Sequence, residues 1–152
     1  MSRRHNALSL SIEHRTIAAR DAQGAVVLTK LPMPPPANNL FANAGACGRV
    51  RSKRYRAWAQ SAGWLIRAQR PPRLRGPVEI TLTFEEGATR ADIDNLAKAP
   101  IDLLVALALI ESDDAYVVRQ VTLRWGAVAG LEVRIQPAPA SPARGPRAGA
   151  RP

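Results

Sequence analysis

Residues 78–104 read VEITLTFEEGATRADIDNLAKAPIDLL, and the first eight of them alternate between apolar and polar side chains. One side of this segment carries Val78, Ile80, Leu82 and Phe84. A period of two is typical of a β-strand that buries one face. We therefore expect a strand over 78–85, followed by a glycine-containing turn and then a helix.

The helix after this strand is expected from about Asp94 to Leu109, because apolar side chains recur there at three- and four-residue steps. Pro100 lies inside the pattern. Proline lacks a backbone donor and clashes with the preceding turn of a helix. We expect a kink at Pro100, or a helix that begins later than the pattern indicates.

Four further elements are expected outside this stretch. A strand over 24–33 is bounded by glycine and prolines, and an amphipathic helix follows Ser52, which is a suitable N-cap. Two more strands are expected over 115–126 and 129–137, joined as a hairpin around the sequence GAVAG. The chain of 152 residues is long enough for one domain.

The order of these elements predicts a single small α/β or α+β domain, with a mixed sheet and two main helices packed on it. We assign this domain to residues 25–136. Residues 1–24 are interpreted as an N-terminal extension. Residues 137–152 are rich in proline, alanine and arginine, which predicts a disordered basic tail.

The composition excludes several classes of protein. Cys47 is the only cysteine, so an internal disulfide and a cysteine-rich zinc site are both excluded. No apolar run approaches the roughly 20 residues that a membrane-spanning helix needs. We expect a cytoplasmic protein without membrane contact.

The charge is strongly positive and unevenly placed. The formal net charge is +10, and no acid occurs between Asp21 and Glu79. Such a long basic interval favours nucleic acid as a partner over an ordinary solvated surface. The basic residues that we expect to contact DNA phosphates are Arg49, Arg51, Lys53, Arg54, Arg56, Arg73 and Arg75.

Most of the acids gather in the second half of the chain, where Asp92 and Asp94 precede the predicted helix and Asp113 and Asp114 follow it. An N-cap role accounts for Asp94, and a turn accounts for the later pair. Taken together, the four carboxylates also suit a divalent cation, and Mg²⁺ prefers such oxygen ligands. A cation held there against a phosphodiester can orient and activate a water.

Lys98 lies four residues after Asp94 and four before Asp102, so helical spacing places the three on one face. This arrangement is either a simple ladder of ion pairs or a lysine held to stabilise charge on a phosphate. Asn95 either holds a carboxylate or caps the turn. The spacing does not choose between these roles.

The segments RADIDNLAKAPIDLL and IESDDAYVVRQV together resemble the core signature of the RusA family of Holliday-junction resolvases. That signature is roughly D-x-D-N-x-x-K-x-x-x-D, followed by a D-D pair that leads into a strand. LPMPPPANNLF is similar to the family's early proline-rich motif, and SKRYRAWAQSAGWLI lies where the family has its first, basic helix. The resemblance extends approximately over 26–125.

The resemblance implies a homodimeric, Mg²⁺-dependent endonuclease that resolves four-way DNA junctions by paired nicks in recombination and repair. Mn²⁺ is an alternative cation, and no organic cofactor is implied. The implied metal ligands are Asp92, Asp94 and one of the later pair, Asp114 being favoured over Asp113 because it leads directly into the strand.

The same resemblance assigns the essential lysine to Lys98, and the asparagine of the proline-rich motif to Asn38 or Asn39. Asp102 matches a recurrent position that we interpret as structural. The implied setting is the nucleoid of a bacterium or a phage-infected cell. The rival interpretations are a non-catalytic or degenerate nucleic-acid-binding protein, and a related metal-dependent nuclease for other branched DNA.

Overall fold

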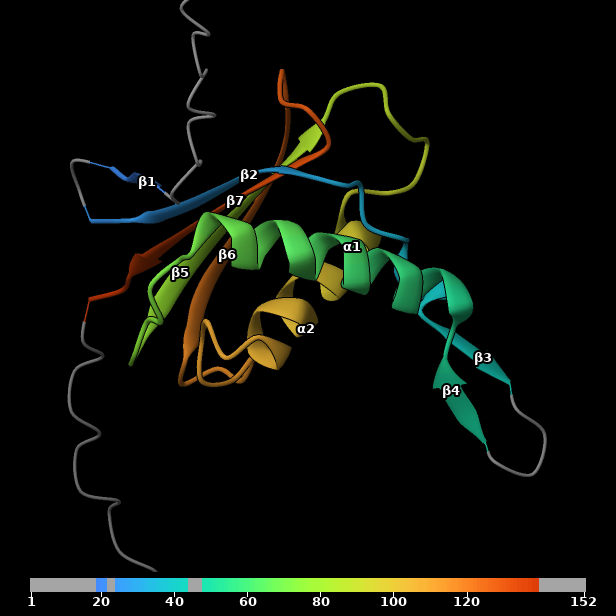
Figure 1. The fold of residues 1–152 in the computed structure, drawn as a ribbon, viewed down its shortest axis with the longest axis horizontal. Helices are drawn as coiled ribbons and strands as arrows, with labels where there is room; N and C mark the ends of the chain where they lie inside the picture. The colour runs from blue at the N-terminus through green and yellow to red at the C-terminus, as the bar shows by residue number, and fades with distance from the viewer. Residues whose placement is uncertain (1–18, 22–23, 44–47, 140–152) are drawn as a thin grey trace, which may run out of the picture.

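The structure is a computed structural model that describes residues 19–21, 24–43 and 48–139. Its main sheet has five strands in the order β1-β2-β7-β5-β6, and β3 and β4 form a separate two-stranded sheet (Figure 1). The strands are β1 Ala19–Arg20, β2 Val26–Leu31, β3 Phe41–Asn43, β4 Arg49–Arg51, β5 Val78–Glu85, β6 Val118–Gly126 and β7 Leu131–Pro137. The helices are α1 Lys53–Gln69 and α2 Lys98–Ala106, with short 3-10 turns η1 Ala37–Asn39 and η3 Asp94–Leu96.

The sheet is mixed, as the sequence predicts, but its last two strands do not form the expected hairpin. β7 pairs antiparallel with both β2 and β5, and β6 pairs in parallel with the far side of β5. The predicted hairpin is therefore wrong. The loop between β6 and β7 crosses the end of β5, where the Glu85 amide donates to the Gly130 carbonyl. The most apolar strand thus gains a neighbour on each side.

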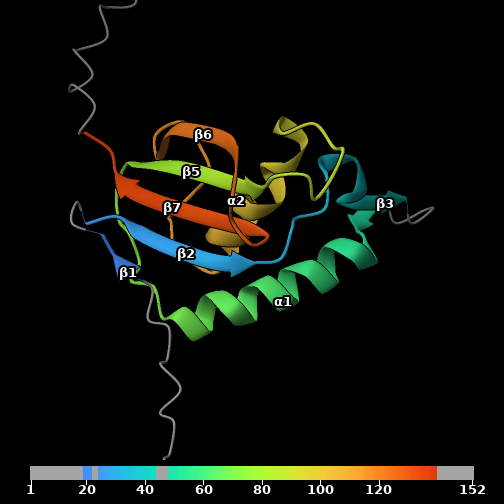
Figure 2. The same ribbon diagram turned by 90° about the horizontal axis from the view of Figure 1, so that it is seen from above.

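One face of the sheet carries the core. Val78, Ile80, Leu82 and Phe84 of β5 are all buried, which confirms the strand and its inward face. The helices α1 and α2 lie against this face, and Figure 2 shows the strands side by side from above with the helices to one side and beneath. A sheet covered on one face explains why its other face is threonine-, glutamate- and arginine-rich.

α1 begins where its sequence predicts, and its last residue joins it to the sheet. The Ser52 hydroxyl accepts a hydrogen bond from the Tyr55 amide at 3.0 Å, which confirms the predicted N-cap. At the other end the buried Gln69 side chain bonds the Thr29 amide at 3.0 Å and the Thr29 carbonyl at 2.9 Å. These two bonds satisfy the backbone amide and carbonyl of Thr29, at a point where the pairing of β2 with β7 is irregular. Gln69 therefore joins the helix to the sheet.

Pro100 does not distort the second helix. The 3-10 turn η3 comes first, and α2 begins at Lys98, so Pro100 is the third residue of the helix. A proline is tolerated in the first turn because its missing amide has no intrahelical partner there. The later start predicted from Pro100 is confirmed.

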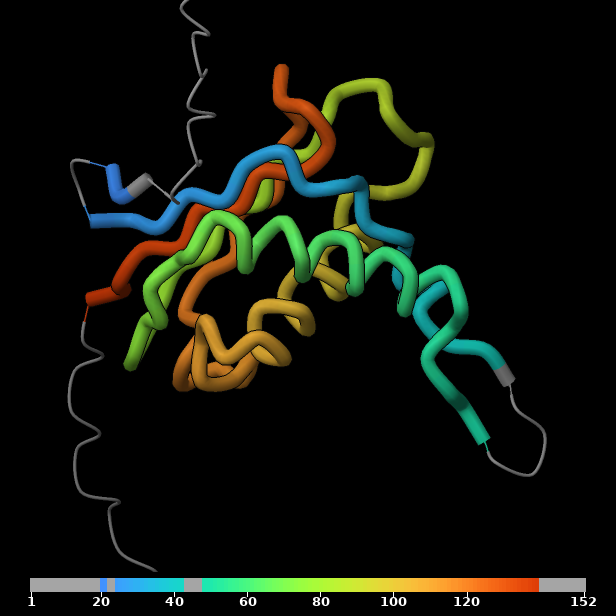
Figure 3. The backbone as a smooth tube through the Cα atoms, in the orientation of Figure 1, coloured from blue at the N-terminus to red at the C-terminus, as the bar shows by residue number. Residues whose placement is uncertain are grey.

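The β3–β4 hairpin projects beyond the N-terminal end of α1, as the backbone trace in Figure 3 shows. Within the predicted extension 1–24, Ala19 and Arg20 form β1 and pair with β2. Residues 1–18, 22–23, 44–47 and 140–152 lie outside the described part of the chain, and so does most of the predicted tail. None of the helices in the described ranges has the length and apolar character that a membrane crossing requires.

Candidate active site

Lys98 is the centre of a charged cluster at the start of α2. Its Nζ atom lies 2.6 Å from Oδ1 of Asp102 and 3.1 Å from Oδ2 of Asp113. The pair with Asp102 confirms the helical spacing, whereas Asp113 arrives from the loop before β6. The Asp102 side chain is 10% exposed and the Lys98 side chain is 51% exposed. A largely buried carboxylate therefore holds a lysine that remains accessible to solvent.

Arg51 extends this cluster to the β3–β4 hairpin. Its Nη1 atom lies 3.1 Å from Oδ2 of Asp102, so this carboxylate contacts two cations. The guanidinium also lies 5.0 Å from the ring centre of Phe41 and 4.4 Å from that of Tyr55. Burial raises the pKa of the Tyr55 hydroxyl, although the charge of Arg51 acts in the opposite direction. Arg51 therefore holds the hairpin against both helices.

Asp114 is held by its own turn and not by Lys98. Its Oδ1 atom accepts from the amides of Tyr116 and Val117 at 2.8 and 3.1 Å, and its Oδ2 atom accepts from the Ser112 hydroxyl at 2.8 Å. The Ser112 bond and the two amide bonds lower the pKa of Asp114 below its ordinary 3.8. Asp114 is thus a fixed, ionised and exposed carboxylate.

Asp92 and Asp94 lie on the segment between β5 and α2, and both are exposed. Within the described residues, neither carboxylate has an ion-pair or hydrogen-bond partner. Asp94 belongs to η3 and not to α2, so the expected contact with Lys98 does not form. The ladder of three predicted from spacing reduces to the single pair of Lys98 and Asp102.

The predicted ligands are not gathered into a finished metal centre. In the described ranges, no three aspartate, glutamate, histidine or cysteine side chains lie close enough together to hold a metal ion. The donor chemistry nevertheless suits Mg²⁺, because Asp92, Asp94, Asp113 and Asp114 are exposed and offer oxygen atoms alone.

The two asparagines of the proline-rich motif lie near this cluster. Asn38 and Asn39 are exposed in η1, which packs against η3 and so against the turn that contains Asp94. The Asn39 carbonyl accepts a 2.6 Å hydrogen bond from the Ser52 hydroxyl. The N-cap of α1 therefore also fixes the motif, and the asparagine side chains remain open to solvent.

The predicted DNA-contacting basic residues divide between the two ends of α1. Near its start, the group consists of Arg49, Arg51, Lys53, Arg54 and Arg56. Arg73 and Arg75 follow its other end and are also exposed. α1 has 17 residues, so about 25 Å separates the two groups. Basic groups at both ends of the helix suit a polyanion that extends along it.

The comparisons with known proteins are consistent with this geometry. Residues 32–136 match the family described as Endodeoxyribonuclease RusA. The chain belongs to the RusA family. The matched span runs from the proline-rich segment to the end of β7 and includes every residue of the charged cluster. RusA is a family of Holliday-junction resolvases that cut within DNA strands, so the predicted nuclease class is confirmed. A comparison with curated proteins finds no match.

Sequence reasoning missed two features of this RusA-family site. Arg51 contacts Asp102 across 51 residues of chain, and no local spacing indicates such a pair. Ser112 orients Asp114, and here a serine two residues before an aspartate was an available signal of a local turn. Arg51 and Ser112 position carboxylates that the sequence analysis had already identified.

Proposed function

We propose that this chain is a Mg²⁺-dependent endonuclease that resolves four-way DNA junctions by paired nicks in recombination and repair. The observation that carries the proposal is the match over residues 32–136 combined with a solvent-open Lys98 between Asp102 and Asp113. A nucleoid-associated location in the cytoplasm suits such a substrate. The basic hairpin and the first turn of α1 supply phosphate contacts beside the same cluster.

Asp92, Asp94 and Asp114 are the proposed ligands of the cation, with Asp113 as the alternative to Asp114. Asp114 is favoured because its oxygens are already oriented by Ser112 and the turn amides. The argument for Asp113 is its position beside the proposed catalytic lysine, since it alone of the later pair contacts Lys98. When bound, Mg²⁺ supplies a Lewis acid that polarises the phosphate and acidifies the attacking water. Mn²⁺ has the same ligand preference.

Lys98 has the proposed role of stabilising negative charge that develops on the scissile phosphate. The hydrogen bond to Asp102 raises the pKa of Lys98 above its ordinary 10.5, so the side chain stays a cation at neutral pH. The Asp102 carboxylate binds the Lys98 ammonium and positions it. We predict that Lys98→Met leaves junction binding nearly intact and removes cleavage.

The decisive experiment compares a labelled four-way junction with a linear duplex, each in Mg²⁺, Mn²⁺ or EDTA. Symmetric nicks on the junction alone, absent in EDTA and absent in Asp94→Asn, are the expected result. Glu86→Gln is the matched control, because Glu86 is another exposed acid in the loop after β5. Binding without cutting in either cation would refute the catalytic part. Equal cutting of linear duplex would refute the junction specificity.

A homodimer is also proposed, because paired nicks need two active sites. β6 supports this, since it is a nine-residue edge strand with an open outer side in the described sheet. Val121 and Trp125 on it are each 38% exposed. Antiparallel pairing of two copies about Thr122 places Val121 opposite the partner's Leu123, and Arg119 opposite the partner's Trp125. No two arginines then face each other, so the strand complements itself.

A single cysteine tests this pairing directly. Thr122→Cys, in a Cys47→Ser background, lies on the proposed two-fold axis and is expected to form a disulfide between copies. Thr81→Cys on the interior strand β5 is the control and is expected to stay monomeric on denaturing gels. If the protein is a dimer in solution but Thr122→Cys does not cross-link, the dimer interface is not formed by β6. A monomer at all concentrations would refute the homodimer.

A further inference from the structure

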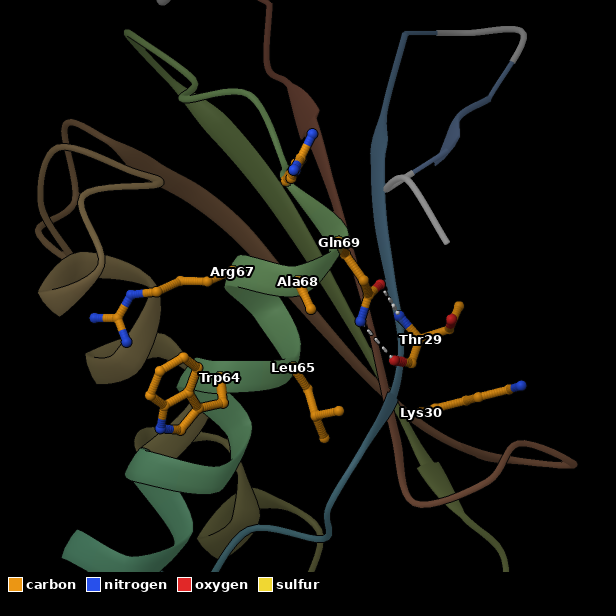
Figure 4. Close-up of a pocket in the computed structure, with 8 residues that line it drawn as sticks. Thr29, Lys30, Trp64, Leu65, Arg67, Ala68 and Gln69 are labelled. Carbon is orange, nitrogen blue, oxygen red and sulfur yellow. Dashed lines mark hydrogen bonds between the residues drawn. The ribbon is translucent and has the colours of Figure 1, made fainter. Parts of the chain in front are cut away.

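The C-terminal end of α1 has a hollow on each side. A hollow of about 560 Å³ is lined by the end of α1 and by Thr29 and Lys30 of β2, and Trp64, Leu65 and Ala68 supply its apolar lining. Figure 4 shows Leu65 and Ala68 on the side of the helix nearer Thr29, and Trp64 and Arg67 on the other side. A second hollow of about 470 Å³ lies between the ends of α1 and α2. Arg67 and Arg70 line both hollows.

Trp64 is unusually accessible for an aromatic side chain. It is 67% exposed and the adjacent Leu65 is 42% exposed, whereas Trp58 on the same helix is 7% exposed. Trp58 is explained by the core and by its 2.9 Å hydrogen bond to the Pro32 carbonyl. Nothing in the described core requires Trp64, so its flat apolar surface is available to a ligand.

The charges around Trp64 all have one sign. The four cations that line the two hollows are Lys30, Arg67, Arg70 and Arg73, and no acid lines either hollow. Within the described residues, none of the four has a carboxylate partner. This set suits an anionic ligand that also presents a flat apolar surface.

The backbone supports a role for two of these cations. In the described ranges, the three non-glycine residues with positive φ are Lys30, Arg70 and Ala108, at 56°, 50° and 54°. Lys30 lines the first hollow, Ala108 lines the second, and Arg70 lines both. Glycine is the usual residue in such left-handed positions, including the end of a helix where Arg70 lies. Lys30 and Arg70 therefore occupy backbone positions that cost them conformational energy, and glycine would avoid this cost.

We propose that this surface binds an unpaired nucleotide of a DNA strand, with the base stacked on Trp64 and the flanking phosphates at Arg67 and Arg70. Arginine and an exposed aromatic side chain are the usual pair of contacts to a strand without a complement. Gln69 already bonds Thr29 in both directions, so this amide does not read the base edge. We therefore expect stacking on Trp64 to dominate and binding to be independent of base identity.

This inference rests on the proposed function for its ligand, but it concerns a different part of the molecule. Trp64 lies 11 residues after Lys53, the first residue of α1, so about 17 Å of helix separates it from the Arg51 end. That distance corresponds to roughly five nucleotides of a strand at duplex spacing. The surface thus holds a nucleotide displaced from the duplex, away from the site of cutting.

Tryptophan fluorescence tests the proposal in EDTA, where no cutting occurs. The probes are a single-stranded oligothymidylate of about 12 nucleotides, a duplex of equal length, and polyglutamate. We expect the single strand to quench emission most. Trp64→Leu should abolish the quenching and weaken binding about 5- to 100-fold, and Trp64→Phe should retain most of the affinity.

Arg70→Gly separates ligand binding from folding. We expect it to weaken single-strand binding about tenfold. Its melting temperature should equal or exceed that of the unchanged protein, because glycine relieves the left-handed backbone. Arg20→Gln removes an equal charge from β1 and should change binding less than about twofold.

Four outcomes would overturn the proposal: unchanged binding in Trp64→Leu, an equal effect of Arg20→Gln, equal quenching by polyglutamate, or a shift of oligomeric state in Trp64→Leu. The third would indicate an acidic protein partner, and the fourth an interface between copies. Junction cutting is measured in parallel on the unchanged protein. Trp64-dependent strand binding without cutting refutes the proposed function alone, and cutting without strand binding refutes this inference alone.

Discussion

Asp102 offers a quantitative test of how the charged cluster is held. Its side chain is 10% exposed, and it contacts Lys98 at 2.6 Å and Arg51 at 3.1 Å. Those two cations are 51% and 40% exposed, so both remain hydrated and each contact is worth about 0.5–1 kcal/mol. Asp102→Asn should therefore lower the free energy of unfolding by about 1–2 kcal/mol.

Asp113→Asn is the matched variant, because Asp113 is 46% exposed and makes one contact with Lys98 at 3.1 Å. Its expected cost is less than about 0.5 kcal/mol. Urea denaturation of the two variants at neutral pH measures both values on the same scale. Equal costs, or a larger cost for Asp113→Asn, would show that burial of Asp102 does not determine the stability of the cluster.

The pH dependence has a definite sign. The hydrogen bond to Asp102 raises the folded-state pKa of Lys98 above 10.5, so the pair stabilises the protein fully below that pH. The stabilisation is lost as the pH rises through the folded-state pKa. The difference in stability between the unchanged protein and Asp102→Asn should stay constant from about pH 6 to 9 and shrink above about 10.5. A difference that disappears near neutral pH would contradict this assignment.

Two further substitutions test the frame of the sheet. Gly130→Ala should cost about 3 kcal/mol or more, measured by thermal unfolding, because φ is +70° and the added Cβ would clash with the Leu31 carbonyl oxygen. A loss below about 1 kcal/mol would mean that β2 and β7 can separate freely there. Gln69→Leu should cost about 2 kcal/mol in urea, because both hydrogen bonds to Thr29 are lost. The exposed Gln60→Leu on the same helix is its control, and a similar effect from both would refute the role of Gln69.

The elements themselves could be predicted from local patterns. The alternation in β5, the Ser52 cap and the effect of Pro100 each depend on residues within one turn or one strand, and all three are confirmed. The neighbours of each strand could not be predicted in this way. β6 and β7 are joined by a short loop with glycine at both ends, which favours a hairpin. Burial of β5 on both of its edges outweighs that local preference.

The candidate site was predictable to the same degree. The pair of Lys98 and Asp102 follows from helical spacing and is confirmed. The contact with Asp113 depends on the loop before β6, and the contact with Arg51 depends on the hairpin, so both needed the tertiary structure. The metal ligands and the cation stay predictions. The four aspartates lie on the segments before α2 and before β6, and residue spacing along such irregular segments does not fix the distance between side chains.

The position of β7 has a consequence for how this protein emerges from the ribosome. Among the strands that the structure describes, β7 is the last to be synthesised, yet it lies between β2 and β5. Until its residues have left the exit tunnel, β2 and β5 each expose an edge with unpaired amides and carbonyls. The nascent chain cannot close its sheet strand by strand, so completion of the fold depends on a late insertion. Synthesis that stalls shortly before Leu131 should therefore yield an aggregation-prone intermediate.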